Sequence, residues 1–229
     1  LGKNKVQGMD YAYTLQGWLK GVNGQLLNAD WDMSKDGKAG EPFANHARDA
    51  LAFSLGYYDN DYTPIAGHNN APAFKMQFTS PTYDQTGVVR STETGRRLYN
   101  GNISIGTYAI AGINAGATHG KSYTYDQLNR LILSRLHTAI SGSFPYWDYT
   151  TNDAAYAESF GYDANGNILR SYRNGASTVQ SPLFMDALLY NYNRDGAGNL
   201  INNRLNYITD NIPGNYHYAD IDYQNPNNY

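Results

Sequence analysis

The nine residues Tyr123-Thr124-Tyr125-Asp126-Gln127-Leu128-Asn129-Arg130-Leu131 carry the pattern that is most informative about how this chain folds. Tyr123 and Tyr125 lie on the same face of an extended segment, because side chains alternate along a strand. Asp126 can accept hydrogen bonds from the backbone ahead of it, and Asn129 tolerates the left-handed conformation that reverses a chain. The final leucine starts a returning strand. The stretch therefore predicts one β-hairpin.

Three further copies of this pattern occur in the chain. Each has an aromatic-x-Tyr pair, a polar turn with Gly or Asn, and an aliphatic residue after the turn. Their defining residues are Tyr11, Tyr13 and Gly17, then Tyr162, Asp163 and Gly166, then Tyr190, Tyr192 and Gly198. The last copy is two residues longer, and we place the additional residues in its turn. A single hairpin is marginal in water, so the copies are expected to pair edge to edge.

The composition agrees with an all-β chain. There are 22 Tyr and 23 Gly, and charged residues make up only 16%. Tyr favours strands, and Gly and Asn supply turn positions. Gly and Asn interrupt most candidate helical windows, and the main exceptions, residues 45–55 and 125–136, could each contain a helical turn. We predict one β-sheet region over residues 1–229, with loops at 23–50, at 64–97 and from Asn211 onward, and a shorter echo of the repeat at Tyr216-His217-Tyr218.

Charge and cysteine content exclude several function classes. A net charge of −3 supplies no field that would attract nucleic acid or anionic lipid. Without cysteine there can be no disulfide, thiolate metal site or cysteine nucleophile. The longest apolar stretch, residues 108–113, is too short to span a bilayer. No signal segment follows Leu1, so we expect an internal fragment of a longer chain whose targeting signal lies upstream.

The hairpin segments resemble the consensus of the YD-repeat, or RHS-repeat, proteins. Further similarity extends in order along nearly the whole chain, at residues 13–21, 32–37, 98–103, 123–131, 160–168 and 203–207. The resemblance implies hairpins wound into a spiralling sheet that forms part of a hollow shell. In toxin relatives the shell encloses a C-terminal effector, and in adhesion relatives it is a cell-surface recognition body. The self-cleaving DPxG-type segment of the toxin relatives does not occur in this sequence, so we do not expect self-cleavage here.

The function implied by the resemblance is a non-enzymatic shell or scaffold segment of a secreted or cell-surface protein. It would enclose or present another part of the polypeptide, with further repeats, a C-terminal effector and secretion-machinery proteins as partners. Two alternatives stay open: a surface module that binds glycan or protein, and a secretion substrate captured in a complex. Tyrosine pairs that face a common buried interior would favour the shell, whereas an exposed aromatic patch would favour binding.

One loop suggests a metal site. Oxygen-bearing side chains at alternate positions followed by Gly37 resemble the opening of a calcium loop. Phe43 stands where the bidentate glutamate of such a loop belongs. We take Asp30, Asp32 and Asp36 as the candidate calcium ligands, with a plain Asx-rich turn as the alternative. No other cofactor is expected.

The remaining chemical signals are weaker. The carboxylates of Asp148, Asp153 and Glu158 would need to meet across the fold to form a glycosidase pair. Aromatic residues are candidates for stacking on sugars, and they also fit ladders that support neighbouring hairpins; they are Trp18, Trp31, Tyr146, Trp147 and Tyr149. We predict no catalytic residue.

Overall fold

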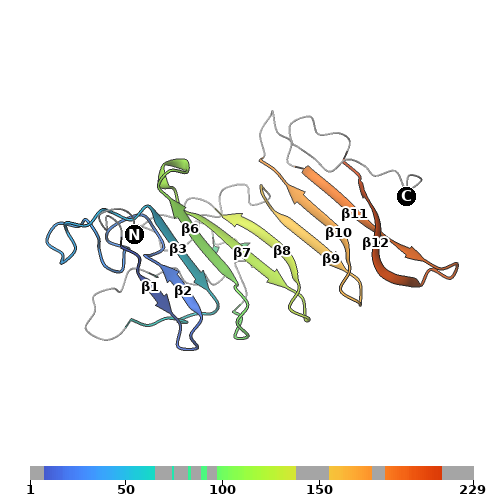
Figure 1. The fold of residues 1–229 in the computed structure, drawn as a ribbon, viewed down its shortest axis with the longest axis horizontal. Helices are drawn as coiled ribbons and strands as arrows, with labels where there is room; N and C mark the ends of the chain where they lie inside the picture. The colour runs from blue at the N-terminus through green and yellow to red at the C-terminus, as the bar shows by residue number, and fades with distance from the viewer. Residues whose placement is uncertain are drawn as a thin grey trace. The chain divides into compact units, whose positions relative to one another are not determined.

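The computed structural model describes residues 8–64, 97–137, 155–176 and 184–212, together with residues 74, 82–83 and 89–91. Ten strands form one antiparallel sheet in the order β1-β2-β3-β6-β7-β8-β9-β10-β11-β12 (Figure 1). A separate two-stranded sheet joins β4 (Thr82–Tyr83) and β5 (Val89–Ser91). One short 3₁₀ turn, Asn114–Gly116, is the only helical element among the described residues. The prediction of an all-β fold of repeated antiparallel hairpins is confirmed.

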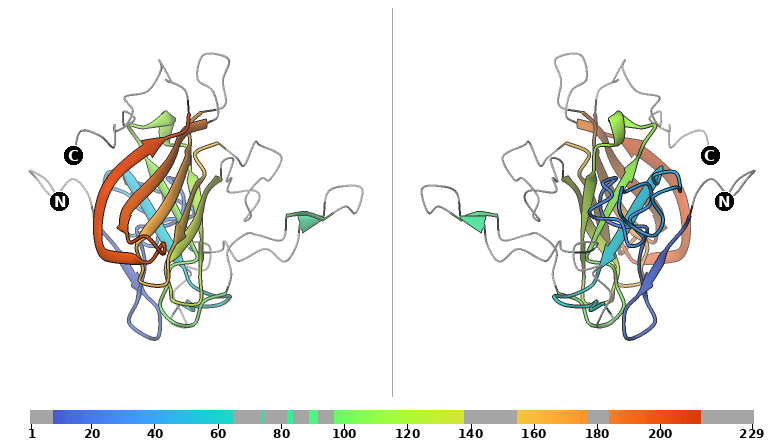
Figure 2. Two further views of the ribbon diagram at one scale, coloured as in Figure 1. Left: turned by 90° about the vertical axis from the view of Figure 1, so that its right-hand side faces the viewer. Right: turned by 90° about the vertical axis from the view of Figure 1, so that its left-hand side faces the viewer.

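The chain divides into two compact units, residues 1–123 with 137–151, and residues 124–136 with 152–229. The boundary between the units falls within β7 and β8. Figure 2 follows the strands from two further sides, from blue through green in the first unit and from yellow to red in the second.

The first unit contributes five strands to the ten-stranded sheet. They are β1 (Tyr11–Tyr13), β2 (Leu19–Val22), β3 (Leu51–Gly56), β6 (Ile105–Ile110) and the start of β7 (His119–Tyr125). Burial alternates along β3, and the buried positions hold small residues such as Ala52 and Ser54. On β6 they face Ala109 and Thr107, which are also buried. This buried face is therefore lined by small side chains.

The second unit contains three consecutive hairpins. Its strands are the end of β7, β8 (Leu131–His137), β9 (Glu158–Tyr162), β10 (Ile168–Asn174), β11 (Phe184–Arg194) and β12 (Leu200–Asp210). Strand β12 is strongly bent in Figure 2. The register explains the bend, because Tyr192 pairs with Leu205 while Arg194 pairs with Leu200, which leaves four residues of β12 opposite Asn193.

The structure corrects one of our secondary-structure predictions. Residues 45–55 and 125–136 contain no helical turn. The first range leads into β3, and the second holds a hairpin turn and most of β8. The predicted loop at 23–50 is confirmed, with a single bridge between Gly24 and Asp32. Most of the predicted loop at 64–97, and the tail beyond Ile212, lie outside the described residues.

Gly198 offers a clean test of the turns, because its φ is 84° and no atom would lie within 4 Å of a Cβ added there. We expect Gly198→Ala to lower the free energy of unfolding by about 1 kcal/mol through backbone strain alone. The matched control is Gly196→Ala in the same turn, where the space is equally open and the φ is not positive. Urea denaturation of both variants makes the measurement, and equal stability of the two would contradict the assignment.

Candidate functional site: the repeated turn and the tyrosine contacts

In the described parts of the chain, the same five-residue turn closes four hairpins. Its copies are Thr14–Trp18, Asp126–Arg130, Asp163–Asn167 and Asp195–Asn199. In every copy the N–H of the first residue donates to the carbonyl of the fifth at 2.8 to 3.0 Å. The N–H of the fourth residue donates back to the carbonyl of the first at 2.9 to 3.2 Å. The fourth residue has a positive φ throughout, and it is Gly17, Asn129, Gly166 or Gly198.

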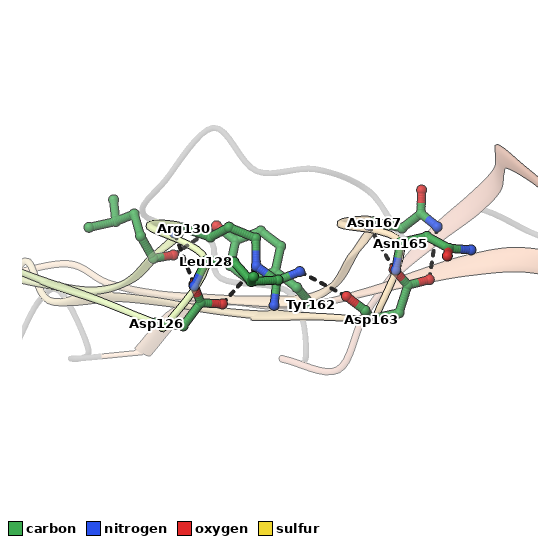
Figure 3. A network of polar contacts seen from close by, with 8 residues as sticks. Asp126, Leu128, Arg130, Tyr162, Asp163, Asn165 and Asn167 are labelled. Carbon is green, nitrogen blue, oxygen red and sulfur yellow. Dashed lines mark hydrogen bonds and ion pairs between the residues drawn. The ribbon is translucent and has the colours of Figure 1, made fainter.

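In three copies an aspartate holds this turn together. Oδ1 of Asp163 accepts the backbone N–H groups of Asn165 and Asn167, both at 2.9 Å, and Oδ2 accepts the Asn167 side chain at 2.8 Å (Figure 3). Asp126 does the same with Leu128 and Arg130, whose guanidinium Nε lies 2.7 Å from Oδ2. The third copy, at Asp195, repeats the pattern with Ala197 and Asn199.

These hydrogen bonds favour the ionised form of the aspartates. The pKa of Asp126 lies below its usual value mainly because of the Arg130 backbone N–H. The pKa values of Asp163 and Asp195 are lowered mainly by the side chains of Asn167 and Asn199. Each carboxylate stays charged and keeps its oxygens on the turn, so a structural role accounts for all three.

The structure corrects the alignment of the fourth copy. Its turn starts at Asp195 and has the same length as the others. The two additional residues, Asn193 and Arg194, belong to β11. Arg194 therefore stands directly before the turn, where the other copies have Tyr13, Tyr125 or Tyr162.

Neighbouring turns of the second unit also contact one another. Nη1 of Arg130 donates to the carbonyl of Asp163 at 2.8 Å, and its guanidinium lies 4.7 Å from the ring centre of Tyr162 (Figure 3). One hairpin further along, the Asn167 side chain donates to Oδ1 of Asn203 at 3.0 Å. The fifth residue of each of these turns therefore reaches into the following hairpin.

A second feature, which we name the tyrosine contact, is made by Tyr57, Tyr162 and Tyr192 in the described part of the chain. In each, a tyrosine hydroxyl donates to the carbonyl of the first residue after a turn, on the preceding hairpin. Tyr57 donates to Leu19 at 3.0 Å, Tyr162 to Leu131 at 2.7 Å, and Tyr192 to Ile168 at 3.0 Å. Burial is the main cause that raises the pKa of all three tyrosines.

Two of these carbonyls lie at a β-bulge. Tyr13 pairs with Leu19 and Ala12 with Gly21, so the register skips Lys20. In the third hairpin the register skips the residue after Ile168 in the same way. A bulge interrupts the ladder of backbone hydrogen bonds at this point. The tyrosine from the following strand supplies a donor there.

The sequence pattern identified only some of these tyrosines. Tyr162 and Tyr192 were predicted as repeat residues, but Tyr57 was missed because Leu55 stands where the pattern has an aromatic residue. A shared signal does exist: an apolar or aromatic residue two positions earlier, namely Leu55, Phe160 or Tyr190. Tyr11 and Tyr13 are more than half exposed, and Tyr123, Tyr125 and Tyr190 are half-buried, so these pairs do not share one buried interior.

Of the three proposed calcium ligands, Asp32 and Asp36 lie next to each other, and Asp30 is engaged elsewhere. The carboxylate of Asp30 pairs with Lys38 at 2.6 Å, which lowers the pKa of Asp30. Asp32 instead accepts the backbone N–H groups of Ser34 and Asp36, as in an Asx turn. Burial raises the pKa of Asp32. Among the residues that the structure describes, no three acidic or histidine side chains are grouped so that they could hold a metal ion.

The other candidates have separate environments. Asp148, Asp153, Tyr146, Trp147 and Tyr149 lie outside the described residues. Glu158 accepts a hydrogen bond from Ser134 at 2.9 Å. Trp31 is buried, and Trp18 packs against Tyr57 with ring centres 5.0 Å apart. Sequence reasoning did not identify another aromatic pair, in which the half-buried Tyr58 stacks on the exposed Tyr99 with ring centres 4.6 Å apart.

No family model and no curated protein matches this chain. In the described parts of the chain, no helix has the length and apolar character needed to cross a membrane. The repeated turn and the tyrosine contacts are therefore the structural features on which a functional proposal can rest.

Removing the hydroxyl groups tests the tyrosine contacts. We expect Tyr162→Phe and Tyr192→Phe each to lower the free energy of unfolding by about 1 kcal/mol, the usual value of one internal hydrogen bond. Tyr172→Phe is the control, because Tyr172 lies on the same sheet, is 41% exposed, and takes part in no tyrosine contact. Thermal and urea denaturation provide the measurement. A loss for Tyr172→Phe equal to the other two would rule out a specific role for the contacts.

The turn aspartates predict a response to acid. Because folding lowers their pKa values below the usual 3.8, the unfolded chain binds protons first as the pH falls. The stability they provide is complete above pH 4 and is lost as the pH falls through their folded pKa values. Substituting Asn for Asp126, Asp163 and Asp195 keeps the turn acceptor and removes the titration. We expect the melting temperature of this triple variant to fall less steeply than that of the natural chain as the pH is lowered below the usual aspartate pKa of 3.8. If the melting temperatures of the variant and of the natural chain fall equally steeply with pH, this prediction is contradicted.

Proposed function

We propose that this chain is a scaffold segment of a YD-repeat type protein, and that its sheet encloses or presents another part of the same polypeptide. The observation that supports this most directly is the threefold tyrosine contact between successive hairpins. Each contact completes the hydrogen bonding of one hairpin with a donor from the next strand. This arrangement suits a long sheet assembled by repetition.

The use of the polar residues supports the same proposal. The aspartates of the repeat are saturated by backbone and side-chain donors of their own turns. The tyrosine hydroxyls of the contacts are directed at main-chain carbonyls. These residues hold the sheet together, and none of them is left available for acid–base chemistry. The proposal therefore assigns no reaction to the repeat.

The location and partners of the scaffold follow from the same proposal. A secreted or cell-surface protein would use the sheet outside the cytoplasm, with the remaining repeats and a C-terminal effector as its intramolecular partners. Secretion-machinery proteins would handle the chain during export. The tyrosine pairs do not share one buried interior, so the proposal rests on the tyrosine contacts and not on an enclosed row of tyrosines.

Surface recognition is the second candidate function, and one observation favours it. Tyr58 and Tyr99 stack with their ring centres 4.6 Å apart, and Tyr99 is 70% exposed. The Gln16 amide donates to the Tyr58 hydroxyl at 2.6 Å and fixes its position. An exposed, oriented aromatic surface with polar neighbours suits a sugar ring.

Limited proteolysis of the longer polypeptide distinguishes the two candidates. In a scaffold that encloses its neighbour, the segment beyond this chain resists protease. Substituting Phe for Tyr57, Tyr162 and Tyr192 together loosens the sheet, and cleavage of that segment then occurs at lower protease concentration. Tyr172→Phe again serves as the control. Equal cleavage of that segment in all forms would contradict the scaffold proposal. Binding to a glycan array that Tyr99→Ala abolishes would support surface recognition instead.

A further inference from the structure

A row of charged side chains crosses one face of the sheet in the second unit. Glu158 on β9 pairs with Arg173 on β10, which in turn pairs with Asp186 on β11. Residues directly opposite each other on neighbouring strands share a face of the sheet. Asp210 on β12 pairs with Leu188, which lies two positions from Asp186 and therefore on the same face. The row thus ends in two aspartates on adjacent strands.

The Asp186 carboxylate is buried, and only one of its oxygens has a partner. The side chain is 1% exposed, and Oδ2 forms an ion pair with Nε of Arg173. Oδ1 is buried and accepts no hydrogen bond from the described residues. A buried carboxylate oxygen that has neither a donor nor a cation beside it is costly, because it has lost its hydration.

Asp210 shows the same division between its two oxygens. The residue is 9% exposed. Its Oδ1 accepts the backbone N–H groups of Ala187 at 2.9 Å and of Ile212 at 3.0 Å. Its Oδ2 is buried and, within the described part of the chain, has no donor. Two neighbouring strands therefore each bring one buried, unsatisfied carboxylate oxygen to the same region of the sheet.

We propose that Asp186 and Asp210 bind one divalent cation, and that calcium is the ion that fits. Diagonal neighbours on one face of adjacent strands lie about 7 Å apart. Two carboxylates can bridge this gap through a shared ion, because calcium–oxygen distances are about 2.4 Å. Backbone carbonyls and water would complete the coordination, since calcium takes about six to eight oxygen ligands.

The charges of the row favour a cation at this place. Within the row the guanidinium of Arg173 is set against three carboxylates, those of Glu158, Asp186 and Asp210. A second positive charge would offset the cost of burying carboxylates of like sign. Glu158 accepts a hydrogen bond from Ser134, so two carboxylates are left as ligands.

This ligand set also predicts the strength and selectivity of binding. No described group of three acidic or histidine side chains could hold a metal ion, and a site with two carboxylates binds weakly. We expect a dissociation constant of about 10⁻⁴ to 10⁻³ M, as in extracellular calcium modules. Magnesium fits less well, because it demands octahedral geometry and keeps several of its waters, whereas these aspartates are buried.

Calcium titration of the whole chain, followed by calorimetry and by thermal denaturation, tests the site. After a chelator has removed divalent ions, we expect one calcium ion to bind per chain. The melting temperature should rise by about 3 to 5 °C at a calcium concentration ten times the dissociation constant. Magnesium at the same concentration, and sodium chloride at the same ionic strength, should raise it much less.

Two substitutions locate the ion. Asp186→Asn and Asp210→Asn each remove one charged ligand at nearly constant volume, and each should weaken calcium binding at least about tenfold. Asp163→Asn is the matched control, because Asp163 lies in the same unit and its oxygens are held by its own turn. Its calcium affinity should be unchanged. Terbium luminescence of the natural chain, displaced by calcium, gives a readout that needs no variant.

Three outcomes would overturn the inference. The first is the absence of binding heat and of a thermal shift with calcium, which would assign the two oxygens to water. The second is an equal shift with magnesium or sodium chloride, and the third is an equal loss of calcium binding in Asp163→Asn. The scaffold proposal has its own readout, the proteolysis of the neighbouring polypeptide, so the two can fail separately.

Discussion

The hydrogen bond from a tyrosine hydroxyl to the carbonyl just after a turn is the interaction on which the rest of this sheet depends. A short hairpin is marginal in water, and a bulge beside its turn interrupts the ladder that would otherwise hold it. A carbonyl left without a partner at such a place costs more than an ordinary hydrogen bond contributes. The donor comes from the following strand, as with Tyr192 and Ile168. A hairpin of this kind is complete only when the next one is present, which couples each repeat to its neighbour.

The first hairpin shows how the same position is reinforced when it is more deeply buried. Its bulge residue is Lys20, whose ammonium lies 2.7 Å from a carboxylate oxygen of Asp61, with both side chains almost wholly buried. Burial lowers the pKa of Lys20, and the charge of Asp61 opposes that shift. The other oxygen of Asp61 accepts the backbone N–H of Tyr57, the residue that makes the tyrosine contact. Removing one partner would leave a buried charge, so the pair fixes the local geometry.

Sequence reasoning predicted what depends on local chemistry and missed what depends on register. The turns at Asp126 and Asp163 were identified because Asx side chains and positive-φ residues determine a turn from within five residues. The two additional residues of the fourth copy, Asn193 and Arg194, were placed in the turn. Two extra residues fit a longer turn or a longer strand equally well, and the sequence alone does not distinguish the two. Tyr57 was missed because its role is set by pairing with β2, far away in sequence. The calcium hypothesis required Asp30 to join Asp32 and Asp36 at one site. The carboxylate of Asp30 instead forms an ion pair with Lys38.

Comparing the four turns separates what the fold requires from what reinforces it. Thr14 replaces the aspartate in the first copy, and its hydroxyl accepts only the Trp18 N–H, at 3.2 Å. The two backbone hydrogen bonds of that turn are nevertheless as short as in the other copies. Asn129 replaces glycine in the second copy and keeps the positive φ. The turn therefore requires a fourth residue in the left-handed conformation, which few residue types adopt readily. The carboxylate of the first residue adds stability to the turn, and the first hairpin forms without it. A repeat held by backbone geometry can change most of its side chains and still form the same hairpin.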